Sequence, residues 1–166
     1  MAVALVAAAI GLAGCTPGPA PKPTPTPLFT SEAEAFKAAE QVYRDYVDAT
    51  NANNDGIKER DPLNYLAGTA LEDAVDGVRK RTAAGTSVKG HVALIDTRMS
   101  SATISAGAAS VVGNVCVDVS GTRLENASGT NVTPTGRAPR ALLAVTFSQS
   151  HERLLITRSE LAGSSC

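Results

Sequence analysis

The chain has 166 residues, a formal net charge of −1 at pH 7 and a pI near 6.1, and this length fits one domain. Fifteen basic residues against sixteen acidic ones leave no basic surface of the kind that binds nucleic acid. Aromatic residues make up 4% of the chain and tryptophan is absent, so a platform on which bases stack is not expected.

The sequence begins with an uncharged run of small and apolar residues, 2–13. A transmembrane helix needs about 20 such residues, whereas the apolar core of a secretory signal needs about 7–15. The run ends in Leu-Ala-Gly-Cys at residues 12–15, which resembles a bacterial lipobox, although no Lys or Arg precedes it. We predict a lipoprotein signal peptide over residues 1–14 and lipid attachment at Cys15. The alternative is a core helix of small residues that happens to end in cysteine.

Proline alternates with other residues over the next segment, 16–27, which holds six of the nine prolines. Every second amide donor is therefore missing, so neither helix nor sheet can form. A polyproline II segment of this length would reach roughly 37 Å, at about 3.1 Å per residue. We interpret residues 15–27 as a lipidated cysteine with a spacer that holds a single domain, residues 28–166, away from a membrane. A ligand for an intracellular proline-recognising module is the alternative.

Residues 28–83 carry the helical signals. Ser31 followed by Glu34 is a capping box, and apolar residues then recur at spacings of three and four. The stripe consists of Phe36, Ala39, Tyr43, Tyr46, Val47 and Thr50. This first helix should end in the turn-forming residues 51–56, where Gly56 can adopt a positive φ.

A second helical stretch is expected from Pro62 to about Ala84, with Asp61 as its cap and Gly68 and Gly77 as points where it divides. The expected buried side chains on it are Leu63, Leu66, Leu71, Val75 and Val78. The basic residues 79–81 fit a solvated helix end, where cations interact favourably with the helix dipole.

From Gly85 onward the apolar period changes to two, which is typical of strands. We expect strands over residues 88–94, 111–119, 142–147 and 153–158, separated by segments rich in Gly, Asn and Pro. Helices followed by strands indicate an α+β fold, in which a long N-terminal helix and further helices pack on an antiparallel sheet of about four strands.

The three cysteines are Cys15, Cys116 and Cys166. If a lipid occupies the first, two remain in an exported domain, and oxidising compartments favour a disulfide between them. Two unpaired thiols are the alternative. Two cysteines and two distant histidines give no recognisable metal-ligand spacing, so no metal or cofactor is expected.

One near-motif overlaps the end of the first helix. Asn51, Asn53 and Asp55, followed by Gly56, match the first half of an EF-hand calcium loop. The twelfth position is Pro62, where such a loop needs a bidentate glutamate. A helix-terminating turn is therefore the better interpretation.

The order of lipobox, threonine–proline linker, long first helix, second helical pair and four strands resembles the actinobacterial lipoproteins with a nuclear transport factor 2-like domain. The similarity extends over residues 12–166, and its specific parts are the lipobox, the strand around 115–118 and the terminal Cys166. It implies a cone, in which a curved antiparallel sheet wraps the long helix. Ketosteroid isomerases and scytalone dehydratases share this fold and use the cone as a pocket. The chain departs from the pattern because its last strand has no tryptophan.

An enzyme of that fold needs a positioned base and an electrophile inside the cone. The candidate pocket residues are Tyr43, Tyr46 and Tyr65, but lone tyrosines on an apolar stripe are usually packing residues. The other polar candidates form no acid–base pair in the sequence, so we assign no catalytic residue. They are His91, Asp96, Asp118 and His151.

We therefore predict a lipid-anchored protein on the extracytoplasmic face of the cell membrane, with a non-enzymatic binding or scaffold role. Its partner would be an unknown envelope protein or a small hydrophobic ligand, and no nucleic acid. A small-ligand carrier or an isomerase- or dehydratase-like enzyme that uses the cone interior is the alternative. Homodimerisation through the exposed face of the sheet is a third interpretation.

Lipid attachment can be tested by replacing Cys15 with alanine. Two or more acyl chains give stable membrane attachment, whereas one does not, so the wild type should enter the detergent phase. The variant should be released into the medium or remain unprocessed. Partitioning of both proteins from an exporting bacterial host measures the difference, and equal recovery of both in the aqueous phase would refute the lipid anchor.

Overall fold

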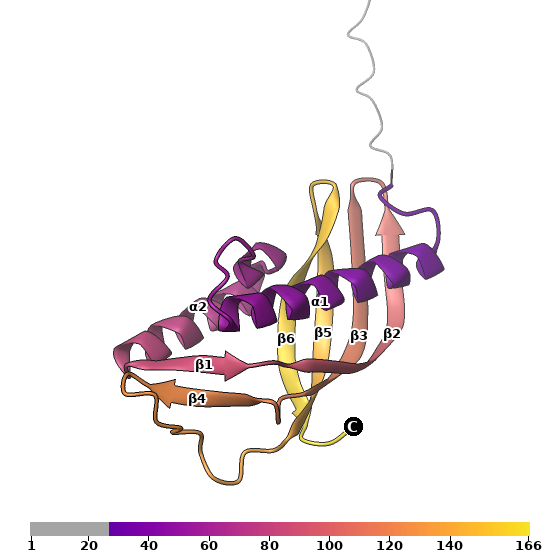
Figure 1. Ribbon diagram of the computed structural model, residues 1–166. Coiled ribbons are helices and arrows are strands. Elements are labelled where there is room, and N and C mark those ends of the chain that lie inside the picture. The colour runs from indigo at the N-terminus through magenta and orange to yellow at the C-terminus, as the bar shows by residue number, and fades with distance from the viewer. Residues whose placement is uncertain (1–26) are drawn as a thin grey trace, which may run out of the picture.

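The computed structural model describes residues 27–166, and the predicted signal peptide, Cys15 and nearly all of the linker lie outside this range. Two helices and a short 3₁₀ helix precede six strands (Figure 1). The predicted α+β class is confirmed. No helix within the described range is long and apolar enough to cross a membrane. The elements are α1 (Glu32–Asn54), η1 (Pro62–Tyr65), α2 (Gly68–Ala83), β1 (Thr86–Gly90), β2 (Ala93–Ser105), β3 (Ala108–Asp118), β4 (Thr122–Asn126), β5 (Arg140–Ser150) and β6 (Arg153–Gly163).

The strands form two antiparallel sheets. The main sheet has the order β2-β3-β5-β6, and β1 pairs with β4 as a separate two-stranded ribbon. In Figure 1, α1 crosses one face of the main sheet and the ribbon lies along the same side, below α1. The expectation of about four strands matches the number of strands in the main sheet, but residues 95–105 of β2 and the strand β4 were not expected.

The segment 88–94, expected as one strand, is divided between the two sheets. Gly90 has φ +83° and ends β1, and β2 begins three residues later. A Cβ at position 90 would collide with the carbonyl oxygen of Gly121, so only glycine fits where these two segments of the chain cross. The single-strand prediction was wrong because Val88, Val92 and Leu94 alternate correctly on both sides of the break.

The first helix follows its sequence signals closely. The Ser31 hydroxyl accepts a hydrogen bond from the Glu34 amide at 3.2 Å. In a capping box the Glu34 carboxylate would accept a hydrogen bond from the amide of Ser31. Here it accepts hydrogen bonds from the amide and hydroxyl of the preceding residue, Thr30, both at 2.8 Å. These two bonds lower the pKa of Glu34. At the other end, Asp55 caps the helix and Gly56 takes φ +89°.

The second helical stretch breaks at Gly68, as predicted, but not at Gly77. Gly68 has φ +53°, which separates η1 from α2, whereas Gly77 lies inside continuous helix. The junction is attached to the edge of the main sheet, because the Ala67 amide donates to the Ile156 carbonyl at 2.9 Å. Val78, expected to be buried, is 45% exposed. It turns toward a groove rather than the core, as described below.

The core lies between α1 and the main sheet. Ala35 and Ala39 are fully buried on α1, and their small side chains let the helix lie close to the strands. Tyr43 and Val47 continue the same stripe and belong to one cluster with the valines of β3, as the spacing predicts. The fully buried sheet residues in this cluster are Val111, Val115, Val145, Phe147 and Ile156.

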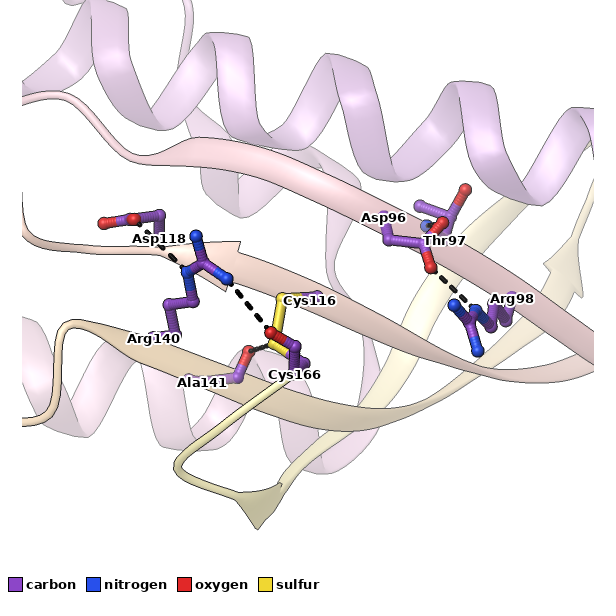
Figure 2. The surroundings of a disulfide bond; sticks show 8 residues. All are labelled: Asp96, Thr97, Arg98, Cys116, Asp118, Arg140, Ala141 and Cys166. Carbon is purple, nitrogen blue, oxygen red and sulfur yellow. Dashed lines mark hydrogen bonds and ion pairs between the residues drawn. A yellow bond between two sulfur atoms is a disulfide. The ribbon is translucent and has the colours of Figure 1, made fainter.

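Cys116 and Cys166 form a disulfide on the opposite face of the sheet, with Cα atoms 6.0 Å apart. Figure 2 shows that Asp118 and Arg140 lie beside it. Arg140 donates to the main-chain oxygen of Cys166 at 3.1 Å and pairs with Asp118 at 3.6 Å. The C-terminal segment is thus attached to β3 and β5, as the cysteine count predicts.

Removal of the disulfide by Cys116→Ala with Cys166→Ala should lower the free energy of unfolding by about 4 kcal/mol, because the bridge closes a chain segment of about 50 residues. Denaturant unfolding of the oxidised protein and the double variant measures this. Reduction of the wild type should give a similar loss. An unchanged unfolding midpoint in both experiments would contradict a stabilising bridge.

Candidate functional site

A groove of about 840 Å³ opens beside the C-terminal half of α1. Its walls come from α1, η1 and α2 on one side, and from β1, the segment after β3 and the loop before β5 on the other. Its apolar lining consists of Pro62, Leu63, Leu66, Ala74, Val78, Val88, Val92 and Val119. The space between α1 and the sheet is thus filled at one end and open at the other.

The wall formed by the ribbon is held by an asparagine clamp, which we define as Asn51, Asn54 and Asp55 acting on residues 90–92. The Asn51 amide group donates to the Val92 carbonyl at 2.9 Å and accepts from the Val92 amide at 2.8 Å. Asn54, which is buried, donates to the Gly90 carbonyl at 2.9 Å. These bonds satisfy main-chain groups at the point where the chain leaves one sheet for the other.

The clamp also accounts for the near-motif that resembled a calcium loop. Asp55 contacts His91 Nε2 at 2.8 Å through a carboxylate oxygen, so the two residues are linked although they are 36 positions apart. Asn53 accepts from Lys58 Nζ at 3.1 Å. Within residues 27–166 no group of three or more His, Cys, Asp or Glu side chains is arranged to hold a metal ion. The asparagines therefore serve structure at this turn.

The three candidate pocket tyrosines occupy different places. Tyr46 lines the groove and also a smaller adjoining cavity of about 220 Å³, and Tyr43 lines only the smaller one. Their rings meet edge to face with centroids 5.7 Å apart. Tyr65, in η1, is half-buried and lies outside both linings.

The tyrosines of α1 hold their protons strongly. Burial raises the pKa of Tyr43 far above its usual value, and the neighbouring Tyr46 adds to the shift. Burial also raises the pKa of Tyr46, although a hydrogen bond with Thr50 and the positive charge of Arg81 act in the opposite direction. Both phenols are therefore neutral near pH 7 and offer hydroxyl groups rather than a base.

Five charged side chains line the groove: Lys58, Asp61, Asp73, Arg81 and Arg137. Arg137 is held against the groove wall, because its guanidinium donates to the carbonyls of Val119 and Thr122 at 2.8 and 2.6 Å. The Asp61 carboxylate is occupied at the start of η1, where it accepts from the Leu63 amide at 2.9 Å. Asp73 is exposed on α2.

The remaining polar candidates lie outside the groove. Asp96 pairs with Arg98 at 2.7 Å on the far side of the sheet. Asp118 accepts from the hydroxyl and amide of Ser120, which lowers its pKa and keeps it ionised. His151 sits in the tight turn between β5 and β6 with φ +56°. None of these three side chains meets a tyrosine of α1. His91, for which no carboxylate partner was expected, instead pairs with Asp55, and neither residue lines the groove.

Sequence reasoning missed the cations of the groove. Lys58 and Arg137 lie in segments that read only as turns, and Arg81 was grouped with its neighbours as a solvated helix end. The spacing of Arg81 four residues after Gly77 is the one local signal, because glycine leaves room over the preceding helical turn. The walls themselves come from segments far apart in the sequence.

No known protein-family profile matches the chain, and no curated protein sequence matches it significantly. Among solved structures it is similar to the intermembrane-space region of the chloroplast protein ARC6, with a TM-score of 0.52 and 16% sequence identity. The match covers 76% of this chain and 95% of that one. At this identity the similarity concerns the α+β fold alone.

Replacement of Asn51 by alanine should lower the free energy of unfolding by about 1–3 kcal/mol, since two hydrogen bonds of about 0.5–1.5 kcal/mol each are lost. Asn53→Ala is the matched control on the same turn, because it removes only an exposed contact with Lys58 and should cost under about 0.5 kcal/mol. Equal losses in denaturant unfolding would show that the clamp contributes nothing specific.

Proposed function

We propose that this protein is a lipid-anchored, extracytoplasmic binding protein whose groove holds a small molecule with a mainly apolar surface. The observation that carries the proposal is the groove itself. At about 840 Å³ it falls within the range of about 300–1,000 Å³ typical of small-molecule sites. Its lining joins many apolar side chains with a few fixed polar groups, which is the usual composition of such sites.

An extracytoplasmic location has two supports. Disulfides persist in oxidising compartments and are rare in the cytosol, and the chain carries the bridge between Cys116 and Cys166. The lipobox at residues 12–15 supports attachment to the outer face of a membrane, and the resemblance to lipoproteins with a nuclear transport factor 2-like domain agrees with it. The proline-rich spacer would then hold the groove clear of the lipid surface.

The enzyme alternative has weaker support. Acid–base catalysis needs a group that gains or loses a proton near neutral pH within reach of the substrate. In the groove and the adjoining cavity, both phenols of α1 are held neutral, Asp61 caps η1, and Asp73 is exposed. We therefore favour binding without chemistry.

Groove binding can be tested with the neutral dye N-phenyl-1-naphthylamine, whose fluorescence rises in apolar surroundings. The whole chain carrying Cys15→Ala, refolded with its disulfide oxidised, is titrated with the dye. Ala74→Phe should weaken binding by about ten-fold or more, because Ala74 lines the groove and the adjoining cavity and a phenyl ring there fills the space.

Glu72→Phe is the matched control, since it adds the same ring at an exposed position of α2 outside both linings. Its dye affinity should equal that of the parent chain. The parent chain and both variants contain the apolar run 2–13, so any dye bound there contributes equally to all three titrations. Equal affinities for all three proteins would refute the groove as a binding site.

A further inference from the structure

Among the side chains of residues 27–166, Arg81 is the one cation of the groove that has no hydrogen-bond or ion-pair partner for its guanidinium. Among the described residues, its guanidinium forms no ion pair and no side-chain hydrogen bond, and only its main-chain carbonyl is used, by the Thr86 hydroxyl at 3.3 Å. Arg79 on the same helix instead pairs with Asp76 at 3.3 Å on the exposed side. No carboxylate of residues 27–166 forms an ion pair with this half-buried side chain.

The guanidinium is positioned toward the groove by the residue one turn earlier. A Cβ at Gly77 would lie 3.1 Å from a terminal nitrogen of Arg81, so the side chain folds back over the bare backbone at that position. Its charge acts on the Tyr46 hydroxyl, which lines the same groove. A glycine inside a helix is intrinsically unfavourable compared with alanine, and here it leaves room for the guanidinium.

The other groove charges are either occupied or set apart. Lys58 donates to Asn53, Asp61 accepts from a main-chain amide, and Arg137 is bound to two carbonyls. Asp73 is exposed and also lines the smaller cavity beside Tyr43, two turns along α2 from Arg81. Within the part of the chain that the structure describes, the unpaired positive charge of the groove therefore lies toward the C-terminal end of α2.

We propose that the groove binds an amphiphile with one anionic head group, a carboxylate or a phosphate, which pairs with Arg81 and donates or accepts a hydrogen bond at Tyr46. The apolar body lies along the floor formed by Leu66, Ala74, Val78 and Val92. This inference rests on the proposed function and adds the charge and orientation of the ligand. Planar guanidinium groups bind both carboxylates and phosphates through two parallel hydrogen bonds, so both head groups fit.

The test compares four single-chain probes below their micelle concentrations: dodecanoate, dodecyl phosphate, 1-dodecanol and dodecyltrimethylammonium. Calorimetric titration uses the whole chain with Cys15→Ala and an oxidised disulfide. At least one anionic probe should bind about ten-fold or more tightly than dodecanol, and the cationic probe should bind most weakly. Whichever of dodecanoate and dodecyl phosphate binds more tightly identifies the head group.

Arg81→Ala should weaken binding of the preferred anionic probe by about ten-fold or more and leave dodecanol binding unchanged. Arg79→Ala is the matched control, because it removes the same charge from the same helix outside the groove, and its affinity should stay within about two-fold of the parent value. Asp73→Asn should strengthen anion binding about two- to five-fold, since it removes a like charge from the lining.

Gly77→Ala provides a second variant that does not depend on deleting Arg81. It should raise the melting temperature, because alanine is the better helix former, and still weaken binding of the anionic probe by displacing the guanidinium. A purely structural role for Arg81 would leave that binding unchanged.

Two results would overturn the inference and leave the proposed function standing, provided that Ala74→Phe still weakens binding of the neutral dye. One is equal affinity for dodecanol and both anions, and the other is an unchanged anion affinity in Arg81→Ala. If the dye itself does not bind in the groove, the proposed function fails, and the inference fails with it.

Discussion

The contact between the end of α1 and residues 90–92 is the constraint on which the rest of the domain depends. At this point the chain leaves the ribbon and enters the main sheet, and the main-chain groups of Val92 lie between the two hydrogen-bonded ladders. Asn51 satisfies both of them, and Asn54 reaches the Gly90 carbonyl. Because buried main-chain groups need partners, the helix end, the ribbon and the first strand of the main sheet are fixed relative to one another.

The side chains of α1 differ in size along the helix, and this difference separates the packed part of the domain from the part that contains the groove. Alanines at positions 35 and 39 bring the first half of the helix onto the sheet, and Phe147 and the valines fill the space behind them. In the second half, Tyr46, Thr50, Asn53 and Asn54 line the groove, and the ribbon held by the clamp stands opposite α2. The groove is the space that remains between them, and Leu66 belongs both to its lining and to the buried core cluster.

The two faces of β3 contribute to different parts of the structure, because side chains alternate along a strand. Val111, Val115 and Val117 face α1 and belong to the core, whereas Cys116 and Asp118 face away from it. The disulfide and the Arg140 contacts thus attach the C-terminal segment to the far face of the sheet (Figure 2). The disulfide and the groove lie on opposite sides of the main sheet.

The sequence by itself determined those features whose physical cause lies within a few residues: the caps of α1, its apolar stripe and the alternation of β3 and β5. The count of cysteines also indicated the pairing of Cys116 with Cys166. Only the tertiary structure decided the division of 88–94, the strand β4, the exposure of Val78 and the place of Arg81 on the groove wall. Each of these depends on a neighbour distant in the chain. The β1 residues pair with 122–126, and Gly90 must pass Gly121. Alternation alone does not report such contacts, because a strand satisfies the same period whichever sheet it joins.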